Sequence, residues 1–234
     1  LNASKEKFLS IIAHDLRTPF NTLIGFATLL LERIETSSRD VLKKQVETLL
    51  TSAERLFALL ENLLAWSRLQ RGLIHYEPQP LDLNYLASST VEVLHAMAEQ
   101  KQIALRNEIR NHFWVNADYY MTTTVMRNLL SNALKFTPSG GEIILSSRQG
   151  ERDIEVSVSD TGVGMTPEVI AKLFRIDAHH TTAGTAGEHG SGLGLILCHD
   201  LARKNGGTIL VESEVGKGTT FRFNLPRYVT QTAT

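Results

Sequence analysis

Apolar residues recur at helical spacing through the first part of the chain. From Lys5 to about Ile34 they follow intervals of three and four residues, which predicts one long amphipathic helix. A short polar break from Glu35 to Asp40 follows, in which Ser38 or Asp40 can cap a second helix. In that second helix the apolar steps alternate between four and three, as in a heptad seam. The predicted seam consists of Leu42, Val46, Leu49, Ala53, Leu56, Leu60 and Leu63.

Two helices joined by a short turn predict a helical hairpin, and a hairpin alone cannot cover both of its apolar seams. Pairing two hairpins in a four-helix bundle would cover them, so we expect a homodimer. The alternative is a monomeric hairpin that packs on the rest of the chain.

The hydrophobic pattern changes after the second helix. Pro78 and Pro80 cannot continue a helix, so we expect a hairpin domain at 1–72, a linker at 73–80, a second domain at 81–228 and a tail at 229–234. In the second domain we expect helices at 84–100, 119–136 and 193–204 and a short one at 168–174. The expected strands lie at 103–109, 114–116, 142–147, 154–159, 208–213 and 219–224. Residues 161–192 are rich in glycine and threonine and read as a long functional loop.

Composition and charge narrow the class of protein. Hydrophobic residues make up 42% and charged residues 21% of the chain, as in soluble globular proteins. The 24 basic and 25 acidic residues leave a formal charge of -1, which argues against nucleic acid or an anionic membrane as a partner. No apolar run approaches the roughly 20 residues that span a bilayer. Because the chain starts inside a helical pattern without methionine, we expect it to be a fragment of a longer protein.

The first helix carries a candidate nucleophile, His14. Thr18 shares its helix face four residues later, and Asp15 lies beside it. A hydrogen bond from Nδ1 of His14 to Asp15 would fix the imidazole tautomer and leave the Nε2 lone pair free to attack. Pro19 removes a helical hydrogen bond, which predicts a bend after the histidine.

Asn128, Asn132 and Lys135 form a second polar group on the predicted helix at 119–136. Spacings of four and three place them on one face. Amide oxygens suit a hard cation such as Mg²⁺, and a lysine one turn further can neutralise phosphate oxygens. A solvated polar face is the alternative interpretation.

Two glycine-rich segments complete the candidate chemistry. Asp160, directly after a strand, precedes Gly162 and Gly164, and its carboxylate can accept a hydrogen bond from the exocyclic amine of adenine. The second segment opens a helix, where free amides attract phosphate. Its residues are Gly190, Ser191, Gly192, Leu193, Gly194 and Leu195. Their spacing fits neither a Rossmann fingerprint nor a P-loop. With no cysteine near them, His179, His180 and His189 are interpreted as solvated loop residues rather than metal ligands.

Together these segments resemble the motifs of sensor histidine kinases of two-component systems, in the family's order and over nearly the whole chain. The string His14-Asp-Leu-Arg-Thr-Pro19 resembles the phosphoacceptor box, and Asn128 to Thr137 resembles the N box. The two glycine-rich segments resemble the glycine boxes, Leu173-Phe174 the F box, and Gly216 to Phe221 the last glycine motif. The implied fold is multi-domain, α and α+β: a dimeric helical hairpin, then an α/β sandwich of the GHKL (Bergerat) ATPase type.

The resemblance also implies roles for residues. His14 would be the phosphorylated residue, Asp15 the general base, and Thr18 the residue that positions water when such proteins dephosphorylate their partner. The implied cofactors are ATP and Mg²⁺, with Asn132 as the metal ligand. The implied nucleotide site comprises Asn128, Asn132, Lys135, Phe136, Asp160, Gly162, Gly164, Phe174, Gly190, Ser191, Gly192, Leu193, Gly194, Leu195 and Thr219. Ser191 departs from the family, where threonine is commoner, and the lid at 175–189 has its own sequence.

The implied function is ATP-dependent autophosphorylation of His14 and transfer of the phosphoryl group to an aspartate of a response regulator receiver domain. It would take place in the cytoplasm, whether or not the parent protein is anchored in a membrane. Three alternatives are a signalling scaffold that binds nucleotide without being labelled, an ATPase that hydrolyses ATP, and a protein whose phosphatase activity dominates. Hydrolysis would want a carboxylate to activate water where this chain has Asn128.

Overall fold

A computed structural model of the chain describes residues 2–71, 75–175, 182–188 and 192–229, without the side chains of residues 2–12, 14, 15, 55 and 70. The chain divides into two compact units. The first covers Leu1–Arg71 and the second begins at Gly72. Each unit is described by itself.

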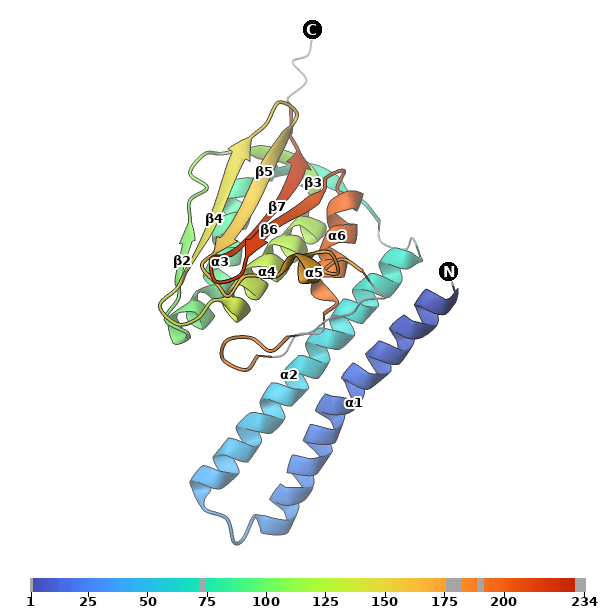
Figure 1. Ribbon diagram of the computed structural model, residues 1–234, viewed down its shortest axis with the longest axis vertical. Coiled ribbons are helices and arrows are strands. Elements are labelled where there is room, and N and C mark those ends of the chain that lie inside the picture. The colour runs from blue at the N-terminus through green and yellow to red at the C-terminus, as the bar shows by residue number, and fades with distance from the viewer. Residues whose placement is uncertain (1, 72–74, 176–181, 189–191, 230–234) are drawn as a thin grey trace. The chain divides into compact units, whose positions relative to one another are not determined.

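The first unit is a hairpin of two long helices, α1 (Asn2–Arg33) and α2 (Arg39–Gln70), as the apolar spacing predicts (Figure 1). Ser38 is the N-cap of α2, and its hydroxyl accepts a hydrogen bond from the Val41 amide at 3.5 Å. Pro19 lies inside α1, which continues through it as one helix. The bend after His14 stays a prediction.

Each helix of the hairpin carries two apolar lines rather than one seam. The line that is buried or half-buried consists of Leu16, Pro19, Leu23, Phe26 and Leu30 in α1. In α2 it consists of Leu49, Leu56, Leu59, Leu63 and Trp66, with the polar residues Gln45 and Ser52 at two further positions. The exposed lines are Phe20, Ile24, Ala27 and Leu31 along α1, with Ile34 in the turn just after it, and Val46, Leu50, Ala53, Phe57, Leu60 and Leu64 along α2. Both exposed lines advance by alternating steps of four and three residues, which is the heptad spacing of a helix packed on further helices.

The predicted seam on α2 mixes these two lines. Leu42, Leu49, Leu56 and Leu63 are half-buried, whereas Val46, Ala53 and Leu60 are exposed. The half-buried line and the exposed line on α2 are offset by one sequence position, which is about 100° around the helix. Steps of four and three residues can therefore follow either line. The hairpin alone therefore partly covers four of the seven predicted seam residues and leaves three exposed.

The second unit is an α/β sandwich with a five-stranded sheet in the order β2-β4-β5-β7-β6. Its strands are β2 (Ala104–Asn107), β4 (Glu142–Gln149), β5 (Asp153–Asp160), β6 (Ile209–Glu214) and β7 (Gly218–Pro226). The β2–β4 pair is parallel and the other neighbours are antiparallel. Figure 1 shows three helices against one face of the sheet: α3 (Leu83–Gln100), α4 (Tyr119–Phe136) and α6 (Gly194–Lys204).

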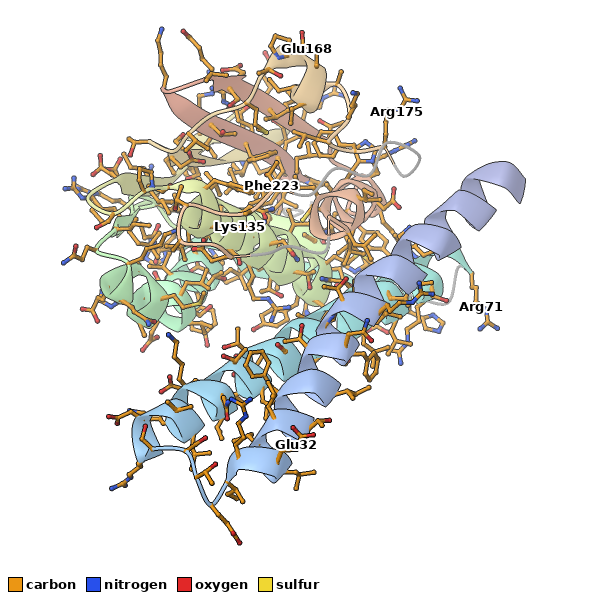
Figure 2. The ribbon with its side chains drawn as sticks, turned by 60° about the horizontal axis from the view of Figure 1, so that its bottom comes forward. Glu32, Arg71, Lys135, Glu168, Arg175 and Phe223 are labelled. Carbon is orange, nitrogen blue, oxygen red and sulfur yellow. The ribbon has the colours of Figure 1, made fainter. Side chains whose placement is uncertain are left out.

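The core lies between the sheet and these helices. Alternate residues of the strands point inward, among them Val156 and Val158 of β5 and Phe223 of β7, which Figure 2 labels. From the helices, buried side chains such as Met126 and Leu130 of α4 meet them. This core holds α4 and the ends of β5 and β7 in fixed relation.

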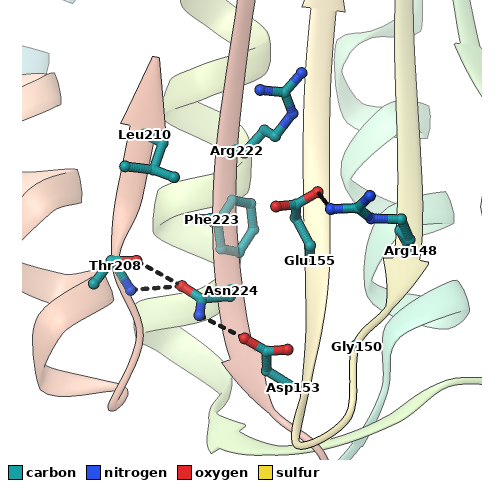
Figure 3. A pocket seen from close by; sticks show the side chains of 9 residues that line it. All are labelled: Arg148, Gly150, Asp153, Glu155, Thr208, Leu210, Arg222, Phe223 and Asn224. Carbon is teal, nitrogen blue, oxygen red and sulfur yellow. Dashed lines mark hydrogen bonds and ion pairs between the residues drawn. The ribbon is translucent and has the colours of Figure 1, made fainter. Parts of the chain in front are cut away.

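The opposite face of the sheet is polar, and side chains of neighbouring strands form pairs across it (Figure 3). Arg148 pairs with Glu155 at 3.2 Å, and Asn224 donates to Asp153 at 2.7 Å. A shallow hollow of about 240 Å³ lies among these side chains. Because its charges already have partners, we interpret this face as a solvated sheet surface.

Two local elements differ from the sequence expectation. Residues 78–80, assigned to the linker, open β1 (Pro78–Asp82), which pairs antiparallel with β3 (Trp114–Asp118). Proline is tolerated there because β1 has a neighbour on one side only. The short helix expected at 168–174 is α5 (Pro167–Ile170), which ends earlier.

Candidate active site

Asp160, the last residue of β5, anchors one end of the candidate site. Its Oδ1 accepts hydrogen bonds from the backbone amides of Gly162 at 2.8 Å and Thr219 at 3.1 Å. Burial raises the pKa of the Asp160 carboxyl, against the opposing effect of those two N–H groups. Within the described part of the chain no hydrogen bond reaches the second oxygen, Oδ2, which can therefore accept one from a ligand.

The loop after Asp160 lies against the C-terminal end of α4. The carbonyl oxygen of Phe136 accepts a hydrogen bond from the amide of Val163 at 3.2 Å. A Cβ added to Gly162 would lie 2.6 Å from that same carbonyl oxygen and 2.6 Å from Oδ1 of Asp160. Glycine is required at position 162 because the Phe136 backbone approaches it closely. Together, Asp160, Gly162, Thr219 and Phe136 form one cluster.

Gly164→Ala is expected to destabilise the second unit by about 3 kcal/mol, combining the cost of a left-handed alanine with that of an overpacked contact. Gly164 has φ +65°, and a Cβ there would lie 1.9 Å from the carbonyl oxygen of Glu214. The control is Gly216→Ala, at φ +79° with nothing within 4 Å, which should cost about 1 kcal/mol. Urea unfolding measures both, and equal losses would contradict the role assigned to the close approach.

The helix α4 presents the second group of candidate residues. Asp118 caps it by accepting the Met121 amide at 2.9 Å, and its bounds are those the sequence predicts. Asn128 and Asn132 are half-buried. The Asn128 amide nitrogen donates to the Thr124 carbonyl at 2.9 Å. Within the described residues the Asn132 side chain makes no hydrogen bond, so its amide oxygen can serve as a ligand for a hard cation.

Lys135, which Figure 2 labels, lies one turn after Asn132 and contacts the glycine- and threonine-rich loop. Its Nζ donates to the carbonyl oxygen of Thr182 at 2.8 Å and lies 4.5 Å from the centre of the Phe136 ring. The candidate phosphate-binding cation is thus close to the loop that the sequence identifies as a lid.

The start of α6 lies beside Asn128. A Cβ added to Gly194, the first residue of α6, would lie 2.8 Å from Oδ1 of Asn128. Leu193 is buried and Leu195 half-buried, and Gly192 has φ +63°. The ring of Phe174 packs at 5.2 Å from the ring of His199 on α6. Gly190 and Ser191 lie outside the described residues.

The phosphoacceptor residues belong to the first unit. His14 and Asp15 lie in α1, but their side chains are outside the described part of the chain. Thr18, one turn later, is exposed. The lid histidines His179, His180 and His189 also fall outside the described residues, among which no group of three His, Cys, Asp or Glu could hold a metal ion.

The sequence motifs did not predict two polar clusters of the second unit. Ser213 accepts the Met165 amide at 2.9 Å and lies 2.9 Å from the Thr219 hydroxyl, so it supports the Asp160 cluster. Lys101 and Glu188 form an ion pair at 2.7 Å beside the end of α4. Neither cluster has a local pattern that could have revealed it, since its members come together only in the folded unit.

Comparison with known proteins identifies a family for each structural unit. The model of the His Kinase A (phospho-acceptor) domain matches residues 4–72, and that of the histidine kinase-, DNA gyrase B- and HSP90-like ATPase matches residues 118–229. The histidine protein kinase DivJ of Caulobacter vibrioides is 31% identical over 97% of this chain and 38% of its own length. The chain thus spans about two fifths of that relative.

Solved structures give the same picture. The structure of full-length ShkA in complex with AMPPNP has a TM-score of 0.66 at 26% identity and covers 96% of this chain and 46% of that one. The histidine kinase ThkA in complex with the response regulator protein TrrA has a TM-score of 0.73 at 21% identity, over 94% of this chain and 61% of that one. At that identity the likeness to ThkA shows the fold.

Among the described helices none combines the length and hydropathy needed to cross a bilayer. The two matched family models follow one another in the order of the two structural units. The chain belongs to the sensor histidine kinases, with a phospho-acceptor domain followed by a catalytic ATP-binding domain.

Proposed function

We propose that the second unit binds ATP and that the γ-phosphoryl group of ATP is transferred to His14. From His14 the phosphoryl group passes to an aspartate of a response regulator receiver domain. The observation that carries the proposal is the Asp160 cluster beside the C-terminal end of α4, in a chain that also carries the phospho-acceptor domain. The proposal places the reaction in the cytoplasm, where ATP is supplied.

The nucleotide would be held by three kinds of group. Oδ2 of Asp160 accepts a hydrogen bond from the exocyclic amine of adenine, because Oδ1 already holds two backbone amides. Lys135 exchanges the Thr182 carbonyl for a phosphate oxygen. The backbone amides in the first turn of α6 bind phosphate.

The half-buried Asn132 fits the role of the Mg²⁺ ligand, since its amide oxygen has no competing partner among the described residues. A Mg²⁺ ion held by the Asn132 amide oxygen would supply positive charge to offset the charge of the transferred phosphoryl group. Asn128, whose amide nitrogen is held by the Thr124 carbonyl, keeps its own oxygen at the first residue of α6.

The reaction is an in-line displacement at the γ-phosphorus. The Nε2 lone pair of His14 forms the N–P bond while the bond from the γ-phosphorus to the bridging oxygen breaks, and ADP leaves with that oxygen. Asp15 accepts a hydrogen bond from Nδ1–H, orients the ring and stabilises its positive charge. Catalysis rests mainly on positioning and charge neutralisation.

We further propose that the first unit works as a homodimer. The exposed line along α2 places Phe57 at 65% exposure and Leu50 at 59%, and that along α1 places Ile24 at 64%. An apolar strip of this length on a helix pair is a surface that association would cover. A second copy offers the same two lines, so two hairpins close into a four-helix bundle.

Two relatives support the proposed ligand and partner. ShkA was solved with AMPPNP, a nucleotide, and ThkA with a response regulator protein. The same classes of ligand and partner suit this chain, because both of its domains match the corresponding family models.

The test is incubation of the chain with γ-labelled ATP and Mg²⁺, beside the His14→Gln variant and, as a matched control, His95→Gln. His95 is an exposed histidine on α3 and should not affect labelling. We expect acid-labile, alkali-stable label on the chain and on the His95 variant, and none on the His14 variant. Nucleotide binding without label would favour a scaffold, and released phosphate without label would favour an ATPase.

A further inference from the structure

Lys101 lies outside every motif, yet it connects three parts of the second unit. Its ammonium donates to the Leu134 carbonyl at 2.6 Å, to the Lys135 carbonyl at 3.0 Å and to Oε1 of Glu188 at 2.7 Å. An ammonium group has three N–H donors, and each of these has an acceptor. With 14% of its side chain exposed, Lys101 is a satisfied and nearly buried cation.

The chain fixes Lys101 from the α3 side. Lys101 is the C-cap of α3, and Gln102 after it takes a left-handed conformation with φ +56°. The Ile103 amide then bonds back to the Ala98 carbonyl at 2.9 Å, which ends the helix tightly. The ammonium is thereby held against the last carbonyls of α4, where the helix dipole favours a positive charge.

On the other side the pair holds the described part of the lid. Oε2 of Glu188 accepts the Ala186 amide at 2.8 Å, and the Thr185 amide donates to the Lys135 carbonyl at 3.0 Å. The Thr185 hydroxyl donates to the Thr137 carbonyl at 2.9 Å. Gly184 packs so closely on Lys135 that an added Cβ would lie 2.6 Å from its Cγ. Residues 182–188 are thus fastened to the end of α4.

This fastening acts on the candidate phosphate-binding lysine. Lys135 has its backbone carbonyl bonded by Lys101 and Thr185, and its Nζ bonded by the Thr182 carbonyl. The clamp, which is the Lys101–Glu188 pair, therefore fixes residues 182–188 at the end of α4, next to the Lys135 side chain. The clamp residues join segments more than 80 positions apart, since Lys101 and Glu188 are separated by 87 residues.

We propose that Lys101 and Glu188 are positioning residues for ATP: by clamping residues 182–188 to the end of α4, they hold this segment and Lys135 ready to receive the phosphates. The inference rests on the proposed function, which supplies the nucleotide.

Glu188→Gln is the sharpest test of the clamp. One carboxylate oxygen becomes an NH₂ group, which must face either the ammonium of Lys101 or the amide of Ala186, so one charge-assisted contact is lost in either orientation. Lys101→Met removes the other half. We expect each variant to raise the dissociation constant for AMPPNP about tenfold, the size expected from one charge-assisted hydrogen bond. The double variant should lose little more than either single one.

Matched controls come from an ion pair of the same unit on the outer face of the sheet. Arg148→Met and Glu155→Gln break the 3.2 Å pair in Figure 3 and should leave AMPPNP binding within twofold of the unchanged chain. In the clamp variants the KM for ATP should rise while kcat for labelling at saturating ATP is kept. Hydrogen exchange should quicken at the amides of Gly184 and Thr185, which donate to Glu188 and Lys135.

The outcomes separate the clamp from the kinase proposal. Clamp variants that bind AMPPNP within twofold of the unchanged chain, with unaltered exchange at 182–188, would overturn the clamp whatever happens to labelling. A fall in thermal midpoint with kcat and affinity reduced together would also overturn it, as a purely structural effect. Normal binding with no label on the unchanged chain would instead contradict phosphorylation of His14, and absence of nucleotide binding would contradict both.

Discussion

Asp160→Asn is expected to raise the dissociation constant for ATP by about a hundredfold or more while leaving the second unit folded. A site built to accept a hydrogen bond from a ligand rejects it strongly when the acceptor becomes a donor. The variant keeps an amide oxygen for the Gly162 and Thr219 amides, which now bond Oδ1 at 2.8 and 3.1 Å. Its NH₂ group then faces the exocyclic amine of adenine, donor against donor.

The control for this substitution is Asp153→Asn at the other end of the same strand. Asp153 accepts a hydrogen bond from Asn224 on the outer face of the sheet, away from the Asp160 cluster. Calorimetric titration with AMPPNP should show near-normal affinity for the control. Purine riboside triphosphate lacks the 6-amino group, so it should bind the unchanged chain weakly. Its affinities for the unchanged chain and for Asp160→Asn should be similar. Tight ATP binding by Asp160→Asn would contradict the proposal that Asp160 accepts a hydrogen bond from adenine.

The same substitution should not reduce stability at neutral pH. Burial raises the pKa of Asp160 in the folded chain, so the ionised carboxylate costs free energy there. A raised folded-state pKa means that stability is favoured below the unfolded pKa, about 3.9, and lost as the pH rises through the folded value. The neutral amide escapes that loss. In urea unfolding, the free energy of unfolding of Asp160→Asn relative to the unchanged chain should therefore be highest at pH 7 and lowest near pH 4. A variant with a markedly lower free energy of unfolding at pH 7 would contradict this account.

The secondary structure was predictable wherever the local signals agreed. The helix α4 has the predicted bounds because Asp118 caps it, its apolar residues share one face, and Thr137 leaves the helical conformation. The strand β5 was visible because Ile154, Val156 and Val158 alternate with polar residues. In contrast, β1 was missed because two prolines mark it as linker, although an edge strand tolerates them.

The candidate site was predictable only as separate motifs. Asp160, Gly162 and Thr219 each lie in a recognisable segment, but only the pairing of β5 with β7 joins the Thr219 amide to Asp160. Lys101 and Glu188 carry no motif, and their contact depends on how α3 ends and how the lid folds back. Long-range polar contacts of this kind leave no periodic trace in a sequence.

The hairpin shows a different limit of sequence reasoning. Its helices are apolar on two adjacent lines, and the periodicity identifies a seam without saying which line the hairpin itself covers. Leu56 and Leu60 belong to one predicted seam, yet the first is half-buried and the second is 43% exposed. The exposed line is the one that a partner chain would cover.

Replacing two exposed seam residues by glutamate, Ile24→Glu with Phe57→Glu, is expected to convert a dimer into a monomer. In the single hairpin these positions are 64% and 65% exposed, so a charge there costs the isolated chain little. In a four-helix bundle they would be buried, and an unpaired buried carboxylate costs several kcal/mol. With two such groups from each chain, the dimer dissociation constant should rise at least about a thousandfold.

Light scattering on a sizing column measures this directly, as a fall in mass from twice 26.0 kDa to 26.0 kDa. The matched control is Thr51→Glu, at an exposed position of α2 outside both apolar lines, which should stay dimeric. Helix content by circular dichroism separates dissociation from unfolding. A double variant that remains dimeric would show that another surface joins the chains. A variant that becomes monomeric, keeps its affinity for AMPPNP and loses label on His14 would mean that phosphorylation requires the assembled bundle, because the ATP site itself is intact.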